Sequence, residues 1–341
     1  MSDLVVIDGR LRWWVPVALV VGLVISASVC VAVGRFPLSP HDVAAAFGSR
    51  LGGEAVSPVL DSVVFGLRLP RIGLAIIVGA GLACAGAAFQ SIFSNPLATP
   101  DTLGVTAGAS VGAVIALVAS LPMLGVQLVS LICGLAAVAL TTAIARTNGR
   151  SNMVMLILSG VVVAAIANAL LSILKYTADP NEKLPQITYW LMGSLSGASG
   201  QGLLVGGPLI AFGVTVIVFL RWRLNILALS EDEARASGMN VRRMRAVIIV
   251  AATLITASCV SMCGQVGWAG LLIPHCARML CGNNNRLVVP VSVFLGAIFL
   301  VVIDTLARTV SASEIPISVL TAVVGAPFFI VLLRRTGGKW A

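Results

Sequence analysis

The feature that most constrains this chain is its series of long apolar runs, of which residues 70–93 are the clearest. After Arg71 this run reaches Phe93 without a charged side chain. A helix rises about 1.5 Å per residue, so about 24 residues cover the roughly 30 Å hydrocarbon core of a bilayer. Arginines stand at its start, and a polar turn, residues 94–101, follows its end. The run therefore predicts a membrane-spanning helix with two chemically different ends.

Composition indicates an all-α polytopic membrane protein in a single transmembrane domain, residues 1–341. Of the 341 residues 58% are hydrophobic and only 10% are charged, whereas soluble domains are about a quarter charged. Backbone polar groups in lipid must be paired internally, which favours helices here because no alternating strand pattern is present. We predict about ten spans, at 13–33, 70–93, 102–121, 125–145, 153–173, 203–220, 246–267, 268–281, 287–309 and 316–333.

The number of spans and the basic residues together predict the orientation. The stretch 246–281 is too long for one helix, and Gly264, Gly267 and Gly270 predict a break within it. Ten spans place both termini on one side, and 15 of the 22 basic residues fall on that side. Because basic residues are enriched in cytoplasmic loops, we expect both termini to be cytoplasmic. The net charge of +9 lies between apolar runs and not along one face, which argues against nucleic-acid binding.

Three hydrophilic connections are longer than ordinary loops. Segments 34–69 and 174–201 are predicted outside, and segment 221–245 inside. The inner segment carries an acidic and then a basic stretch, with Gly238 ending a short helix. It is either a solvated loop or a contact surface for a soluble partner, since connections are usually much shorter.

Five motifs, in order, resemble one known family. They are RLPR with NPLATPDTLGVTAGAS (68–71 and 95–110), YWLMGSLSG (189–197), ALSEDEARASG (228–238), GQVGWAGLLIPHCAR (264–278) and DTLARTVSASEIPISVLTAVVGAPFFIVLLRR (304–335). Together they are similar to the FecCD-like permease subunits of the type II ABC importers for iron–siderophore, haem and cobalamin. The resemblance covers about Trp13 to Arg335 and implies a bacterial cytoplasmic (inner) membrane location.

The resemblance also implies an architecture and an assembly. Spans two to five and seven to ten would form an inverted pseudo-repeat. The permease would act with a second permease subunit, as a homodimer or with a related paralogue. Two cytoplasmic ATPase subunits and a periplasmic or lipid-anchored substrate-binding protein would complete the importer.

The resemblance assigns a docking role to Arg68, Arg71 and Arg308, which are expected on the outer side, where basic residues are disfavoured. There they would receive carboxylates of the binding protein, to which arginine makes planar bidentate bonds. Headgroup anchoring or a local ion pair is the structural alternative. Asp304, the only acid within a predicted span, precedes Arg308 by four residues, so we expect pairing within that helix to hold it.

The resemblance places a gate and a coupling element at the cytoplasmic mouth. The gate turn is Asn95, Pro96 and Leu97, although Asn-Pro at a helix end is also an ordinary turn. A second gate segment is Ser151, Asn152 and Met153, which departs from the Ser/Thr often found in the family. The ATPase-coupling residues are Ala228, Leu229, Glu231, Ala234, Arg235 and Gly238.

We therefore predict the permease subunit of a binding-protein-dependent ABC importer for a ferric siderophore or similar metal chelate, working by ATP-driven alternating access. Haem, cobalamin and molybdate are alternative substrates. The chain is not predicted to be an enzyme, because it lacks GxxxxGK[ST]; ATP and Mg²⁺ would be bound by the partner ATPase. An ion-coupled secondary transporter is disfavoured, because it would need buried acids near the midplane and Asp304 alone is a poor candidate. An intramembrane enzyme is disfavoured because the predicted spans contain no Ser/His, HExxH or paired-Asp constellation.

No cofactor or metal site is predicted within the chain. Cys259 and Cys263 stand four residues apart, a spacing that could hold a metal, but small core residues explain them better. His275 has no cysteine or carboxylate at metal-ligand spacing and is interpreted as a polar residue within a span.

Overall fold

The computed structural model describes residues 5–7, 9–34, 36–147, 150–151, 153–229, 231–311 and 313–336. This part of the chain is almost entirely helical, with two small antiparallel hairpins. Strand β1 (Val6–Ile7) pairs with β2 (Arg10–Leu11), and β3 (Arg146–Thr147) pairs with β4 (Arg150–Ser151). The predicted all-α class is therefore confirmed.

Each predicted span contains a helix in the described part of the chain. These helices are α2 (Trp14–Ala32), α5 (Leu69–Ile92), α6 (Val105–Val118), α7 (Met123–Ile144), α8 (Met153–Thr177), α10 (Gly200–Leu227), α12 (Val241–Cys263), α13 (Ala269–Cys281), α14 (Asn285–Thr309) and α15 (Ile317–Thr336). Seven helical segments are long and apolar enough to cross a membrane, among them a continuous segment Pro58–Ile92. The helices α6, α13 and the apolar part of α15 are shorter.

The prediction for span 102–121 is wrong in length. Its first residues form a 3-10 turn, η2 (Pro100–Leu103), and Gly104 has φ +77° before α6 begins. Proline cannot continue a helix and a left-handed glycine interrupts one, which explains the late start.

The predicted break in 246–281 is confirmed and falls between Gly264 and Trp268. These two residues have φ +72° and +64°, so the chain reverses its path between α12 and α13. Glycine adopts this conformation without steric cost, whereas for tryptophan it is a strained conformation that the packing must enforce.

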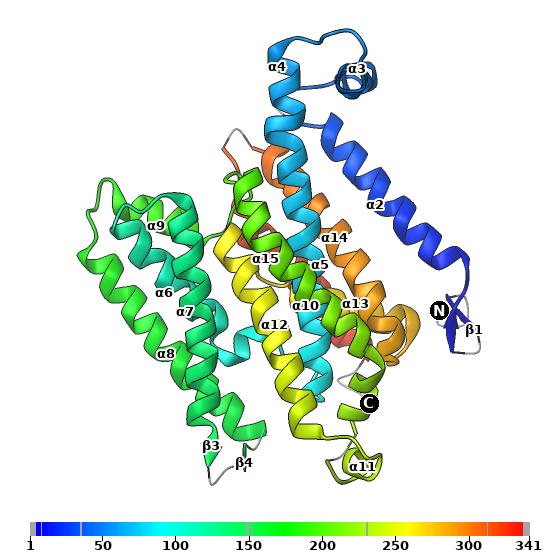
Figure 1. The fold of residues 1–341 in the computed structure, drawn as a ribbon, viewed down its shortest axis with the longest axis vertical. Helices are drawn as coiled ribbons and strands as arrows, with labels where there is room; N and C mark the ends of the chain where they lie inside the picture. Colours follow the sequence, from blue (N-terminus) through cyan, green and yellow to red (C-terminus); the bar gives the residue numbers. More distant parts are fainter. Residues whose placement is uncertain are drawn as a thin grey trace.

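The connecting elements gather at the two ends of the bundle (Figure 1). Helices α3 (Pro40–Arg50), α4 (Pro58–Asp61) and α9 (Lys183–Leu191) lie at the upper end, where the π-helical turn η1 (Ser62–Arg68) leads from α4 into α5. The β3–β4 hairpin and α11 (Glu231–Ala236) lie at the lower end. This division agrees with the predicted one, in which 34–69 and 174–201 share a side opposite to 221–245.

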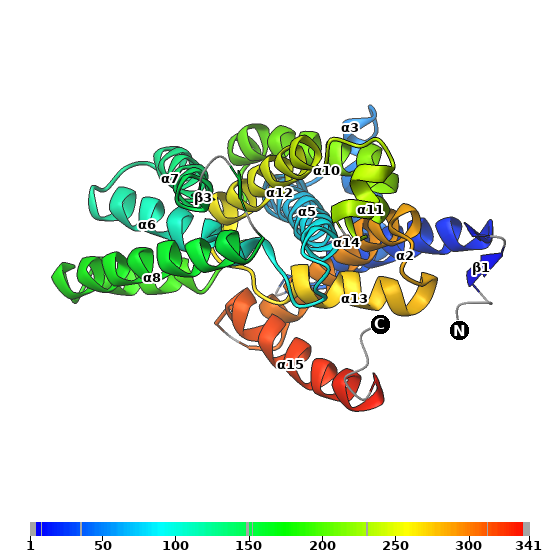
Figure 2. The same cartoon turned by 90° about the horizontal axis from the view of Figure 1, so that it is seen from below.

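Helix α5 is the centre of the bundle, with α10, α12, α13 and α14 around it (Figure 2). In its most apolar window 78% of the residues are buried, against 17% for the peripheral helix α2. The α5–α14 contact is close because Gly79 and Gly296 meet, and a Cβ on either would overlap the other's carbonyl oxygen. Small residues of this kind let helix backbones approach in lipid, where hydrophobicity cannot drive association.

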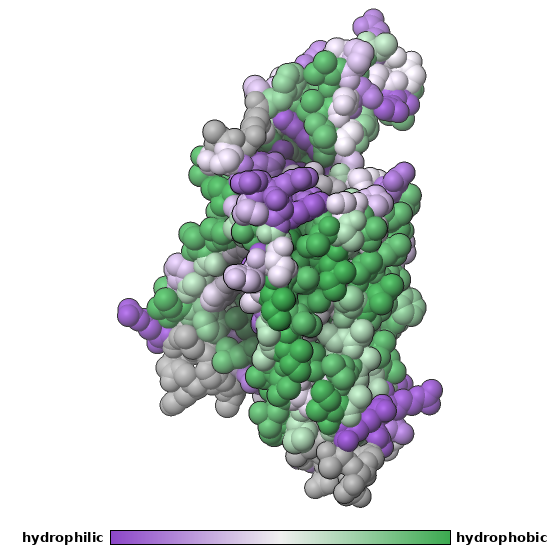
Figure 3. Space-filling view, turned by 90° about the vertical axis from the view of Figure 1, so that its left-hand side faces the viewer, coloured by the Kyte–Doolittle hydropathy of each residue, from purple (hydrophilic) through white to green (hydrophobic). Residues whose placement is uncertain are grey.

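The surface matches a membrane-embedded bundle. A broad hydrophobic band covers the face shown in Figure 3, and hydrophilic residues gather toward its two ends. Apolar side chains of other helices, such as Val24, Leu158 and Phe219, are also exposed. An apolar surface this large marks contact with lipid or with another subunit.

The two halves of the bundle share one irregularity. The second helix of each predicted repeat is short, α6 with 14 residues and α13 with 13, and each follows a residue with positive φ. This correspondence supports the predicted inverted repeat of α5–α8 and α12–α15, which stays a prediction.

Candidate functional site

The upper end of the bundle holds an ion cluster between α5 and α14. Arg71 Nη2 lies 2.8 Å from Asp304 Oδ1, and Arg71 Nη1 lies 2.8 Å from Glu314 Oε1. Arg308 Nε is 3.6 Å from Asp304 Oδ2. The Asp304 side chain is only 1% exposed, so its charge depends on these guanidinium groups.

Arg68 and Arg308 bind the carbonyl end of α2. Arg68 Nη1 donates to the carbonyls of Val31 and Ala32, the second at 3.1 Å, and its Nη2 donates to that of Phe36. Arg308 Nη2 donates to the carbonyl oxygen of Cys30 at 2.5 Å. The last carbonyls of a helix lack partners within it and attract cations, so these arginines close the end of α2.

The structure thus brings Arg68, Arg71 and Arg308 together across more than half of the chain, as the family resemblance implies. All three are largely buried, and their hydrogen bonds go to this chain. Docking of a binding protein stays a prediction, and the local ion pair named as its alternative is present. The expectation that Asp304 is held within its own helix is incomplete, because its shortest contact is with Arg71 of α5.

The gate turn lies at the opposite end of α5. Asn95 N donates to the carbonyl of Gln90 at 3.1 Å, and Asn95 Oδ1 accepts from Leu97 N at 2.9 Å. The latter is a side-chain turn typical of asparagine. Ser94, with φ +46°, donates through its hydroxyl to the carbonyl of Ala228 at 3.3 Å. The residue just before the gate turn therefore contacts the first residue of the predicted coupling segment.

The coupling segment forms a short helix, as predicted. Helix α11 contains Glu231, Ala234 and Arg235 and is followed by Gly238 with φ +75°. Ala234 is buried at 1% exposure, whereas Leu229 is 50% exposed. Helix α11 contacts α10 and α12.

The second predicted gate segment lies at the same end of the bundle. Ser151 belongs to β4, Met153 begins α8, and Asn152 lies outside the described residues. The β3–β4 hairpin lies apart from α11 in Figure 1.

A buried polar network at the base of α5 was not predicted. Arg278 of α13 donates to Gln90 Oε1, and Ser91 Oγ donates to Asn285 Oδ1 at 2.8 Å. Asn285 N in turn donates to Asn225 Oδ1 of α10 at 2.8 Å. Gln90 and Arg278 are polar residues within apolar runs, and they were the only signal of this network in the sequence.

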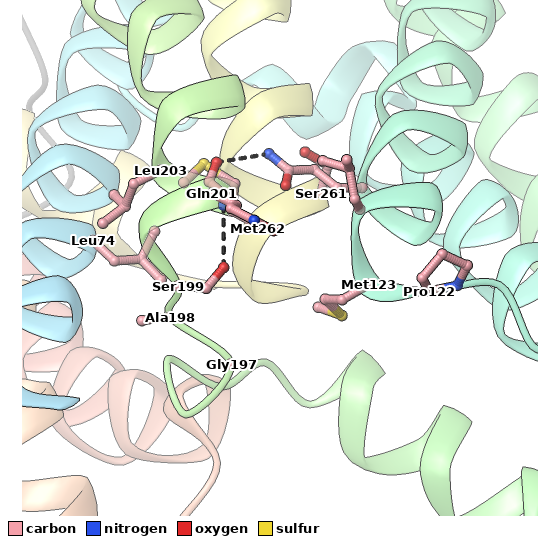
Figure 4. A pocket seen from close by; sticks show the side chains of 13 residues that line it. Leu74, Pro122, Met123, Gly197, Ala198, Ser199, Gln201, Leu203, Ser261 and Met262 are labelled. Atoms are coloured by element: carbon pink, nitrogen blue, oxygen red, sulfur yellow. Dashed lines mark hydrogen bonds between the residues drawn. The ribbon is translucent and has the colours of Figure 1, made fainter. Parts of the chain in front are cut away.

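One cavity lies beside α5 at the start of α10 (Figure 4). It has a volume of about 190 Å³ and is lined by residues of α5, α7, α10 and α12, including Leu74 and Met262. Gln127 donates to the carbonyl of Gly202, whose N–H donates to Ser199 Oγ. Pockets that bury drug-sized ligands are roughly 300–1,000 Å³, so this cavity is too small for a bulky chelate.

The cysteines that could have bound a metal are core residues. Cys259 and Cys263 are buried, and Cys263 Sγ lies 3.0 Å from the carbonyl oxygen of Cys259. Among the described residues, no group of three His, Cys, Asp or Glu is placed to hold a metal ion.

Comparison with known proteins agrees with this geometry. The FecCD transport family matches residues 19–335. The chain is 37% identical over 313 residues to the molybdate import system permease protein MolB of Haemophilus influenzae, covering 92% of this chain and 93% of that protein. It is 33% identical to the Fe(3+)-citrate import system permease protein YfmE of Bacillus subtilis, covering 94% and 95%.

A solved structure shows the same fold. It is an inward-facing ABC transporter of the metal-chelate type, with a TM-score of 0.86 and 36% identity, covering 95% of this chain and 100% of that one. PsaBC from Streptococcus pneumoniae shares the fold more distantly, with a TM-score of 0.55 and 17% identity over 77% of this chain and 89% of that one.

The relatives are permeases of the bacterial inner membrane, and the seven apolar helices suit that location. The chain belongs to the FecCD transport family and is a permease subunit of an ABC importer.

Proposed function

We propose that this permease moves a metal chelate, with a ferric siderophore as the leading candidate, into the cytoplasm by ATP-driven alternating access. The observation that carries the mechanism is the hydrogen bond between Ser94 and Ala228. It joins the end of the central helix α5 to the segment where a cytoplasmic ATPase would bind. Motion of the coupling segment at Ala228 would therefore be passed to Ser94, the residue before the gate turn.

The proposed assembly contains a second permease copy or a related subunit, two ATPase subunits and a substrate-binding protein. Helices α8 and α15 carry exposed apolar side chains, such as Leu158 and Val323, which support a subunit interface at these two helices. A pathway between two subunits also suits a bulky substrate, since the cavity beside α5 is too small for one.

Relatives support the chelate as the substrate class, and one supports a second candidate. Iron chelatin, Fe(3+)-citrate, hemin and cobalamin permeases all resemble the chain at 33% to 37% identity. The molybdate permease is 37% identical to this chain and covers 92% of it. Molybdate is thus the second candidate.

Reconstitution tests both parts of the proposal. The permease with its ATPase in proteoliposomes should take up substrate only when ATP and a loaded binding protein are present. Binding proteins loaded with a ferric siderophore, haem, cobalamin or molybdate should then be compared for stimulation of ATP hydrolysis. Stimulation by the siderophore-loaded protein supports the proposal, and stimulation by molybdate alone selects the second candidate. Uptake without any ATPase subunit would contradict the importer mechanism.

A further inference from the structure

A second cavity opens at the lower end of α10 and is strongly basic. It has a volume of about 460 Å³ and is lined by Phe219, Arg221, Trp222 and Arg286. Arg221 and Trp222 come from the last part of α10, and Arg286 comes from the first turn of α14. Two guanidinium groups and two aromatic rings therefore surround one opening.

Neither arginine has an acidic partner among the described side chains. Arg221 Nη1 donates to the carbonyl of Val218 at 3.0 Å, which orients the guanidinium and leaves its other donors available. Arg286 is exposed. Guanidinium groups bind phosphate through paired N–H donors, so the opening suits an oxyanion.

Asparagines link the two helices that carry the arginines. Asn225, one turn after Arg221, donates through Nδ2 to Asn284 Oδ1 at 2.9 Å. The backbone N of Arg286 donates to the same oxygen at 3.1 Å. These bonds place the backbones of the two arginines beside each other at the α10–α14 contact.

The surface of α10 beside this cavity is apolar and exposed. Phe219 is 74% exposed, and Phe212, about two turns earlier in α10, is 62% exposed. Trp222 is 49% exposed at the basic end. Tryptophan is typical of the membrane–water interface, and basic pockets between helices there bind lipid head groups. The ligand should therefore combine an anionic head with apolar chains.

The ATPase-coupling surface lies on the other side of Trp222. The groove there is formed by α10 and α12 and includes Gly238 and Arg243. The basic cavity instead faces α14. The two openings adjoin at Trp222, which lines both, but Arg221 and Arg286 line only the basic cavity.

We propose that Arg221 and Arg286, with Trp222 and Phe219, bind the phosphate of an anionic phospholipid of the surrounding membrane. The lipid chains lie along the exposed face of α10. The lipid holds the base of α10 against α14, because its phosphate contacts an arginine on each helix.

Native mass spectrometry of the purified full-length chain in detergent tests this proposal. Phosphatidylglycerol and phosphatidylcholine with identical chains are titrated separately. We expect phosphatidylglycerol to bind more tightly, and the Arg221→Gln/Arg286→Gln double variant to lose about 25-fold in that affinity, about 5-fold per arginine. Arg242→Gln is the matched control, since Arg242 is exposed at the same end but does not line the cavity.

Three results would overturn the proposal: equal binding of the two lipids, an unchanged affinity in the double variant, or displacement of the lipid by millimolar inorganic phosphate. Loss of ATPase copurification with lipid affinity retained would assign the arginines to a protein interface instead. If the double variant does not fold, a photoreactive phosphatidylglycerol is applied to the unaltered protein. Crosslinks to peptides containing Phe219 or Arg286 support the site, and crosslinks confined to other peptides refute it.

Discussion

Arg71 and Asp304 are 233 residues apart in the chain, yet their side chains form a buried ion pair with a 2.8 Å contact. Removing one partner of a buried pair costs about 3–5 kcal/mol when the remaining charge is uncompensated, and Arg308, at 3.6 Å, is the only other cation beside Asp304 among the described ion pairs. We therefore expect Arg71→Gln to lower the thermal unfolding temperature of the detergent-solubilised protein strongly.

The exposed pair Arg50–Asp61 is the matched control for this prediction. Its contact is 2.7 Å, as short as the 2.8 Å contact of the buried pair to within 0.1 Å, but the two side chains are 58% and 36% exposed. Exposed pairs contribute about 0–1 kcal/mol, so Asp61→Asn should change the unfolding temperature little. Equal effects of the two variants would mean that the α5–α14 pair is not a major determinant of stability.

The contact between Gly79 and Gly296 gives a second prediction. A Cβ at Gly296 would overlap the carbonyl oxygen of Gly79 and the side chain of Ala83. Gly296→Ala should cost about 1–3 kcal/mol, as overpacking of a close contact does. Gly48→Ala in α3 meets nothing within 4 Å and should be neutral or slightly stabilising. The measurement is thermal unfolding of both variants; a neutral Gly296→Ala would show that the helices can separate.

The hydrogen bond from Ser94 to Ala228 gives a prediction about coupling. Ser94→Ala removes it, and such a bond contributes about 0.5–1.5 kcal/mol net. We expect transport per ATP hydrolysed to fall by about 2- to 10-fold in proteoliposomes while ATP hydrolysis continues. Ser172→Ala is the control, because the Ser172 hydroxyl donates to the carbonyl of Asn168 in its own helix. An unchanged transport ratio in Ser94→Ala would exclude this contact from the coupling path.

Helix α3 should be sensitive to acid. Ser39 and Asp42 form a capping box, and the hydrogen bonds from Ser39 lower the pKa of Asp42 below its ordinary value of 3.8. A lowered carboxyl pKa stabilises the helix above that ordinary value, and the stabilisation is lost as the pH falls through the lowered pKa. Hydrogen-exchange protection factors in 40–50, which are corrected for the intrinsic pH dependence of amide exchange, should therefore fall at low pH in the unaltered protein. In Asp42→Asn the protection factors should be lower throughout and nearly independent of pH, and a persistent pH dependence would point to another group.

Hydropathy was enough to locate the helices within the predicted spans, because a helix that crosses a bilayer needs a long apolar run. It did not locate their ends, which depend on local chemistry such as Gly104 before α6. The cross-helix pair of Arg71 with Asp304 could not be predicted from spacing, since only Arg308 stands at helical spacing from the acid. The polar network at the base of α5 could not be predicted either, because Gln90 and Arg278 lie 188 residues apart in the sequence.

The close seating of α5 on α14 has a mechanical consequence. Helix α5 is 24 residues long, or roughly 36 Å at 1.5 Å per residue, and carries Arg71 at one end and leads into Ser94 at the other. Because Gly79 and Gly296 leave no space between the two backbones, we expect α5 and α14 to move as one unit in the transport cycle.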